Sequence, residues 1–222
     1  MPVLDEAATL EAALRPLQPL RERGVEVIVV DGGSRDGTAR LAQPWVDRVL
    51  AAPRGRASQM NAGARAARGE ALLFLHADTL LPPEADRLVT DALAQRPWGR
   101  FDVAIAGADP LLAVVALLMN LRSRATGVAT GDQAVFVRRD VFFAAGAFAE
   151  IPLMEDVALS KTLRRMAPPC CLRERVVTSG RRWERHGTLR TILLMWRLRL
   201  EFALGADPRR LARRYGVERT SS

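Results

Sequence analysis

Acidic side chains follow apolar runs at several points of the chain, where they could hold a metal ion or take up a proton. In ALLFLHADT, residues 71–79, five apolar residues without polar alternation end in His76-Ala77-Asp78. Such a run predicts a strand buried on both faces, which places Asp78 at the carboxyl end, where open α/β sheets bind ligands. A carboxylate there suits a hard divalent cation, with His76 as a second candidate ligand. An aspartate that simply ends a strand is the alternative.

A second apolar run, VEVIVV at residues 25–30, leads into DGGSRDGT at residues 31–38. Asp31 directly follows the expected strand, and the glycines after it permit a tight turn that presents free amides and a carboxylate to a ligand. An ordinary strand-to-helix loop is the alternative. The segment matches neither GxGxxG nor GxxxxGK[ST], so the commonest dinucleotide and nucleoside-triphosphate sites are disfavoured.

A third segment, residues 53–70, has two arginines in a glycine-bearing loop before an alanine-rich helix. Guanidinium groups and free amides at a helix amino terminus both favour phosphate oxygens, so Arg54 and Arg56 are candidate diphosphate ligands. Asn61, a polar residue near the start of the helix, is a further candidate. A solvated basic loop would have the same composition.

Five segments occur in an order that resembles the family 2 nucleotide-diphospho-sugar glycosyltransferases with the GT-A fold, over roughly residues 2–190. They are PVLDEAATL, VVDGGSRDGT, PRGRASQMNAGARAARGEALLFLHADT, GDQAVFVRR and PLMEDVALSKTLRR. LHADT and GDQAVFVRR are similar to a bacterial subgroup of small, stand-alone members whose acceptors are poorly defined. The family has a complete strand before PVxxE, so a shortened amino-terminal end is expected here.

The resemblance implies a donor site for a nucleoside-diphosphate sugar. Asp31 matches the acid that contacts the nucleoside, and Glu6 falls in the first loop of the nucleotide pocket. Asp78 matches the second acid of the DxD motif, which holds Mn²⁺ or Mg²⁺ against the diphosphate. His76 stands where the family usually has the first acid, so its imidazole is a further candidate ligand.

The resemblance also implies an acceptor side, with an unidentified hydroxyl compound as acceptor. Asp156 matches the general base, which would take the proton of the attacking hydroxyl, and such assistance is typically worth about 10² to 10⁴ in rate. A single displacement at the anomeric carbon inverts its configuration. Glu155, next to Asp156, is assigned to the same acceptor side, and Arg182-Trp183 resembles the RW pair of some processive relatives. Asp132, in the loop of GDQAVFVRR, either orients the acceptor or only terminates a helix. Acids that only complement a helix dipole are the alternative for Glu155-Asp156.

The chain is long enough for one substantial core, with 222 residues and 49% hydrophobic content. Strands are expected at 25–30, 48–51, 71–75 and 134–138, and helices at 7–15, 37–43, 57–68, 83–95, 111–122, 155–166 and 188–203. This alternation predicts a single α/β domain of GT-A type, with a Rossmann-like, mainly parallel central sheet flanked by helices. Residues 1–100 would form the nucleotide-sugar half, 101–205 the acceptor half and 206–222 a basic carboxyl-terminal tail.

The net charge is +8, and Lys161 is the only lysine. Basic residues gather late, in RRWERHG, MWRLRLEF and DPRRLARRYG, which suits an anionic membrane surface or a lipid-linked acceptor. A nucleic-acid-binding protein is the rival from another class, but acids converging on one cleft disfavour it, and no nucleic acid is expected. A non-catalytic sugar-nucleotide binder and a nucleotidyltransferase are further alternatives.

The cysteines, Cys170-Cys171, are adjacent and lack disulfide or metal-finger spacing, so reduced, partly buried thiols are expected. No charged leader with an apolar region is found at the start. A cytoplasmic protein is therefore expected, with peripheral contact at the inner face of the membrane as a further expectation.

Overall fold

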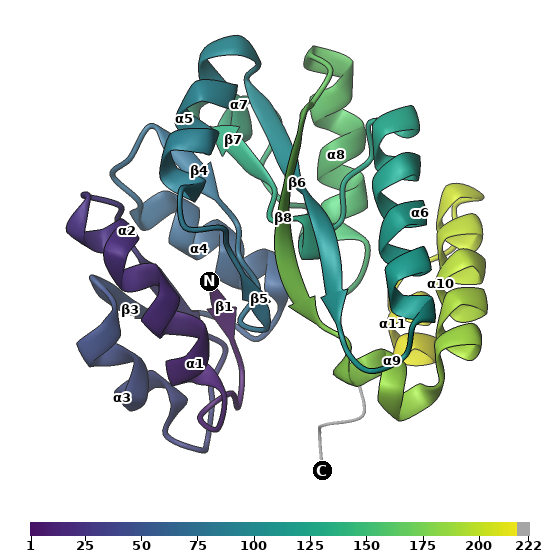
Figure 1. Ribbon diagram of the computed structural model, residues 1–222, viewed down its shortest axis with the longest axis horizontal. Helices are drawn as coiled ribbons and strands as arrows, with labels where there is room; N and C mark the ends of the chain where they lie inside the picture. Colours follow the sequence, from purple (N-terminus) through teal and green to yellow (C-terminus); the bar gives the residue numbers. More distant parts are fainter. Residues whose placement is uncertain (217–222) are drawn as a thin grey trace.

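The computed structural model describes residues 1–216, apart from the side chains of Arg182 and His186, and places the strands in two sheets (Figure 1). The first sheet is parallel, with the order β1-β2-β3. Its strands are β1 Pro2–Val3, β2 Ile28–Asp31 and β3 Arg48–Ala51. All residues of β2 are buried, which is why this strand reads as an unbroken apolar run in the sequence.

The second sheet has five strands in the order β4-β7-β6-β8-β5. Only β6 and β8 pair in parallel, while the other neighbours are antiparallel. Its strands are β4 Ala71–Leu73, β5 Thr79–Leu80, β6 Trp98–Ala106, β7 Phe136–Arg138 and β8 Cys170–Ser179.

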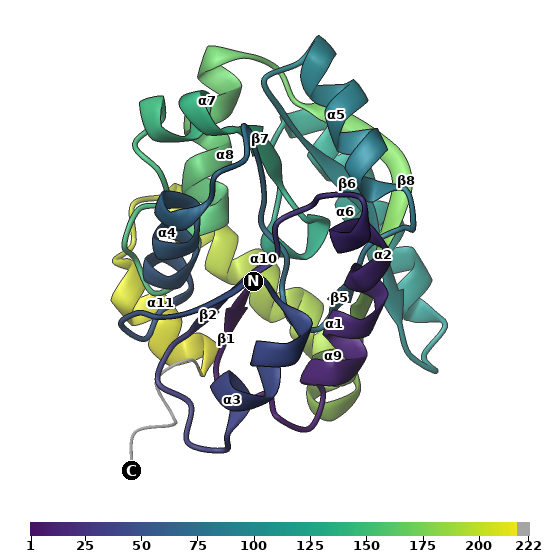
Figure 2. The same ribbon diagram turned by 90° about the vertical axis from the view of Figure 1, so that its left-hand side faces the viewer.

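Helices cover both sheets. Viewed from the side of the first sheet, α4 lies on one side of its strands and α1 on the other (Figure 2). The second sheet has α5 on one face and α6 on the other (Figure 1). The α-helices are α1 Leu10–Leu14, α2 Gln18–Glu22, α3 Thr38–Ala42, α4 Arg56–Ala66, α5 Ala85–Gln95, α6 Leu111–Thr126, α7 Arg139–Ala144, α8 Glu155–Met166, α9 Arg181–His186, α10 Thr188–Ala203 and α11 Pro208–Tyr215. Short 3₁₀ helices are η1 Arg15–Leu17, η2 Gln43–Trp45 and η3 Gly131–Gln133.

The α/β class expected from the sequence is confirmed, and each expected strand and helix has a counterpart, with shorter bounds in several cases. The strand pairing differs from the expected mainly parallel central sheet, because the second sheet is mostly antiparallel. An apolar run indicates a buried strand but not which strand lies beside it. The two longest strands, β6 and β8, were not predicted, since charged residues interrupt both.

The expected basic tail is partly a packed helix. In α11, Leu211 and Ala212 are fully buried against Leu198 of α10 and the loop before α8. Two apolar residues on one face of an arginine-rich helix are enough to pack it against the protein. The number of arginines in this segment gave no indication of that packing. The rest of the expected tail, 217–222, lies outside the described residues.

Both cysteines are free thiols at the start of β8 and half-buried, as expected. Burial raises the pKa of the Cys170 thiol, so it stays protonated at neutral pH.

Candidate active site

A cavity of about 220 Å³ lies where the loops after β4 and before α8 meet α9, α10 and α11. We call it the Asp156 cavity. Seven of the residues predicted to form the site line it: Arg56, His76, Asp78, Asp132, Glu155, Asp156 and Trp183. A larger cavity of about 680 Å³ lies between the two sheets, but none of the predicted site residues lines it.

Asp156 is held by backbone amides at the start of α8. The amide of Gly131 donates to one carboxylate oxygen of Asp156 at 2.7 Å, and the amide of Val157 donates to the other at 2.7 Å. Met154, the residue immediately before α8, is buried and has φ 71°, a left-handed conformation that is rare outside glycine. This turn aims the first residues of α8 into the cavity, and strain of this kind is common at functional sites.

The loop GDQ, which forms η3, connects Asp156 with the histidine of the LHADT segment. A Cβ atom at Gly131 would lie 2.3 Å from Cε1 of His76, so only glycine leaves room for the imidazole. Asp132, the next residue, has a carboxylate oxygen 3.5 Å from Nδ1 of His76. The fully buried Gln133 secures the turn by accepting a hydrogen bond from the amide of Thr130 at 3.2 Å.

Burial raises the pKa of both acids at the start of α8. For Asp156 the desolvation is opposed in part by the two backbone amides, and the net pKa is raised. For Glu155 burial is again the main cause, and the negative charge of Asp156 raises its pKa further, while Arg56 lowers it. A carboxylate with a raised pKa is a stronger base, which suits proton uptake near neutral pH.

Replacing Glu155 by Gln is expected to stabilise the fold at pH 7. The unfolded carboxyl ionises near pH ~4.3, whereas the folded one ionises at higher pH, so ionisation removes stability as pH rises through this interval. Gln cannot ionise and avoids this cost. Urea unfolding at pH 7 and pH ~3 measures the effect, which should vanish at the lower pH, where both carboxyls are neutral. Equal stability at pH 7, or the same gain in an exposed control, Glu150→Gln, would contradict it.

Arg56, which also lines the cavity, supplies positive charge. It is the first residue of α4 and follows Gly55, whose φ of 142° favours glycine. Desolvation lowers the pKa of Arg56, but the charges of Glu155, Tyr215 and Asp132 outweigh it, so the pKa is raised. The guanidinium therefore remains charged beside the acids.

Asp78 has an exposed carboxylate, whereas the imidazole of His76 is buried next to Asp132. The side chain of Asp78 is exposed at the cavity and accepts a weak hydrogen bond from Thr79 at 3.4 Å. Among the described residues no group of three His, Cys, Asp or Glu side chains is placed to hold a metal ion by itself. Asp78 thus fits a divalent cation that completes its coordination with diphosphate and water. His76 is 9% exposed and packed on Gly131, which fits a positioning residue better than a ligand.

Glu6, Asp31 and Arg54 lie outside the Asp156 cavity: Asp31 is the last residue of β2, and the other two are in the loops after β1 and β3. The carboxyl ends of neighbouring parallel strands share one edge of the sheet, so these loops are adjacent. A hydrogen bond joins the loop after β1 to the start of α3: the amide of Glu6 donates to the hydroxyl of Thr38 at 2.9 Å. The buried carboxylate of Asp31 accepts hydrogen bonds at 3.0 Å from the amides of Gly33 and Ser34 and so shapes its own loop.

Residues 1–107 match glycosyl transferase family 2. The resemblance inferred from sequence is thereby confirmed for the segment that carries Glu6, Asp31 and Asp78. The match to family 2 ends before Asp132, Glu155 and Asp156, so it leaves the acceptor half untested. No curated protein sequence matches the chain.

Solved structures show the same GT-A fold. A mannosyltransferase from Pyrobaculum calidifontis in complex with GDP-Man and Mn²⁺ has a TM-score of 0.60 and 22% identity, over 79% of this chain and 54% of that one. S. aureus TarS in complex with UDP-GlcNAc has a TM-score of 0.62 and 15% identity, over 80% and 56%. Glucosyl-3-phosphoglycerate synthase from Mycobacterium tuberculosis, with Mn²⁺, UDP and glucosyl-3-phosphoglycerate, has a TM-score of 0.56 and 20% identity, over 80% and 68%. The chain therefore spans little more than half the length of the first two proteins.

Asn61 lies in the part that matches family 2, but its predicted role in donor binding is not supported. Its side chain is 4% exposed, donates to the carbonyl of Phe148 at 2.9 Å and accepts from the amide of Phe148 at 3.0 Å. The carboxamide therefore fastens α4 to the loop before α8. A buried polar residue that satisfies the backbone cannot be told from a ligand by its position in the sequence.

Beyond the segment that matches family 2, the structure adds cavity residues that the sequence did not indicate. Trp183 lines the cavity from α9 as predicted, whereas the side chain of Arg182 lies outside the described residues. The additional lining residues from the end of the chain are Thr178, Ser179, Thr191, Met195, Arg199 and Tyr215. The helical spacing of those on α10 was a signal, since they share one side of a helix whose other side is apolar.

Proposed function

We propose that the protein transfers a sugar from a nucleoside-diphosphate sugar to a hydroxyl group of an acceptor, with inversion at the anomeric carbon. The observation that carries this proposal is that the half-buried base candidate Asp156 and the exposed carboxylate of Asp78 line one cavity. The family 2 match and the GT-A fold support it. The complexes of the similar proteins with GDP-Man, UDP-GlcNAc and Mn²⁺ support the class of donor and the use of a divalent cation.

Asp156 would act as the general base. The amides of Gly131 and Val157 fix both carboxylate oxygens, so the carboxylate is held still while one oxygen accepts the proton of the attacking hydroxyl. His76 and Asp132 would position the loop that supplies the Gly131 amide.

Asp78 and Arg56 would act on the leaving group. A divalent cation, when bound, would supply positive charge to the departing diphosphate, and Asp78 is the residue that would hold it. Arg56 keeps its charge beside the cavity and adds a guanidinium to the same task. Arg54 would contact the diphosphate from the loop before α4.

The acceptor would enter from the side of α9 and α10. Trp183 offers an aromatic face there, and Arg199 has a buried Nε atom without a hydrogen-bond partner in the described part of the chain. An unpaired guanidinium nitrogen suits an anionic group, so we include a lipid phosphate among the candidate acceptors.

A binding screen tests the proposal. Thermal unfolding is measured with UDP, GDP, UDP-Glc, UDP-GlcNAc and GDP-Man, each with and without Mn²⁺ or Mg²⁺. A ligand at about 100 times its dissociation constant adds ~2.7 kcal/mol of stability, which is readily seen. Stabilisation by none of these probes would contradict the proposal. Binding without hydrolysis or transfer to any acceptor would indicate a non-catalytic binder instead.

Replacing Asp31 by Ala is expected to weaken nucleoside diphosphate binding even when metal is withheld. Its proposed contact is to the base or ribose, and its carboxylate also orders the Gly33 and Ser34 amides. Calorimetric titration with UDP and GDP in a chelating buffer measures the change, with Asp91→Ala, an exposed acid on α5, as the control. Unchanged affinity would remove Asp31 from the donor site.

A further inference from the structure

Two neighbouring helices carry apolar stripes that point away from the protein. On α6 the exposed residues recur at helical spacing and are 41–56% exposed; they are Leu111, Val114, Leu117, Leu118 and Leu121. On α10 and the residue after it the exposure is 61–78%, at Leu189, Leu193, Trp196, Leu200 and Leu204. We call these ten residues the α6–α10 face.

The helices themselves are firmly attached through their opposite sides. Leu112 and Val115 of α6 are buried, and this helix packs on β6. The buried Leu198 of α10 packs on α11. The two helices also contact each other and stand side by side at the right of Figure 1. The apolar side chains of the α6–α10 face therefore do not hold the helices in place, since each helix is attached by the buried residues on its other side.

The charges on these helices are almost all positive. Helix α6 contains two arginines and no acid, and α10 contains three arginines and one acid, Glu201. That glutamate is paired with Arg197 at 2.8 Å and with Arg214 at 2.6 Å, so its charge is neutralised. Arg190 is exposed beside the stripe on α10.

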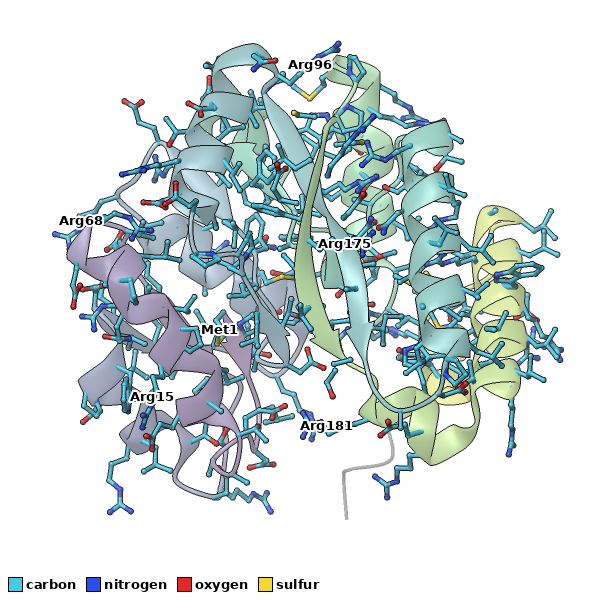
Figure 3. All side chains as sticks on the ribbon, viewed as in Figure 1. Met1, Arg15, Arg68, Arg96, Arg175 and Arg181 are labelled. Carbon is cyan, nitrogen blue, oxygen red and sulfur yellow. The ribbon has the colours of Figure 1, made fainter. Side chains whose placement is uncertain are left out.

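Positive charge alone does not single out this face. Arginines project from widely separated places on the protein, as Arg15, Arg68, Arg96, Arg175 and Arg181 show (Figure 3). What distinguishes the α6–α10 face is the combination of cations with rows of leucine and an exposed tryptophan. Leucine and tryptophan favour the boundary between head groups and acyl chains, and arginine favours anionic head groups.

We infer that the α6–α10 face docks on the surface of an anionic phospholipid bilayer. A second copy of the chain is a poorer occupant, because a symmetric contact would bring these arginine-bearing helices against each other. No helix in the described part of the chain is long and apolar enough to cross a membrane. Helix α10 would then separate lipid from the cavity, since Thr191, Met195 and Arg199 on its other side line that cavity.

Vesicle sedimentation with the full chain tests this inference without any sugar-transfer assay. The protein is expected to bind vesicles of phosphatidylcholine with about 30% phosphatidylglycerol more tightly than pure phosphatidylcholine vesicles. The pair Leu193→Ser with Trp196→Ser should weaken binding about tenfold or more, because two apolar side chains lose their burial. Arg190→Gln alone should weaken it about fivefold, and only on the anionic vesicles.

The matched control is Leu41→Ser on α3, an exposed leucine that is 47% accessible and far from this face in the sequence. It should bind as the parent does, and the melting temperatures of all variants should agree. Failure of the parent to bind anionic vesicles, or parental binding by the Leu193 and Trp196 variant, would overturn the inference. So would a stable dimer that this variant dissociates, since the face would then be an interface between copies. Donor binding would survive each of these outcomes, so the proposed function stands or falls separately.

Discussion

Replacing Asp156 by Asn is expected to lower the rate of sugar transfer by about two or more orders of magnitude while donor affinity changes little. Asn has nearly the same size, and its single oxygen can still accept the hydrogen bond from the Gly131 amide, while the hydrogen bond from the Val157 amide is lost. It cannot accept the proton of the attacking hydroxyl at neutral pH. The loss should therefore appear in turnover, not in the binding of a nucleoside diphosphate.

The measurement requires a donor and acceptor pair identified from the binding screen, followed by steady-state kinetics and calorimetry on the same preparations. Asp91→Asn, an exposed acid on α5, is the matched control and should behave as the parent. Parental turnover in the Asp156 variant would exclude this residue as the base and with it the single-displacement mechanism. Parental turnover in Asp156→Asn together with a large loss in a folded Asp132→Asn variant would shift the role of base to Asp132.

Replacing Asp78 by Ala is expected to abolish the part of nucleotide binding that depends on Mn²⁺ or Mg²⁺. A cation that bridges protein and diphosphate needs this carboxylate, which is exposed at the cavity and has only a weak hydrogen bond of 3.4 Å. The fold should be unaffected, because the side chain is not part of any core cluster. Affinity for UDP and GDP, measured with metal and with a chelator, should become the same in the variant.

His76→Ala is the companion to this test. If imidazole only positions the Gly131 loop, as its packing indicates, metal dependence of binding stays while turnover falls. If metal dependence is lost as well, His76 is a ligand. An Asp78 variant that bound nucleotide and metal as tightly as the parent would exclude the metal assignment altogether.

The α6–α10 face shows why the charge of a segment must be considered together with the direction in which its side chains point. The sequence indicated a basic end to the chain, but MWRLRLEF does not show that Trp196 and Leu200 point outward while Arg199 points into the cavity. Helical periodicity gives two faces of α10 but not which neighbour covers each one. The packing of α10 on α11 and α6 decides that.

By itself the sequence determined the α/β class, the donor-side order of motifs and the position of Asp31 at the end of the buried strand β2, because apolar runs and the residues that end them are local properties of the chain. The expected strand buried on both faces before Asp78 is wrong, since β4 ends at Leu73, begins with the exposed Ala71 and lies at the edge of its sheet. Only the tertiary structure decided that Asn61 serves the backbone of Phe148, that Gly131 makes room for His76 and that α11 is a packed helix. It also decided the antiparallel pairing in the second sheet. These outcomes depend on contacts between residues far apart in the chain, and the free energy of such contacts has no local signature in the sequence.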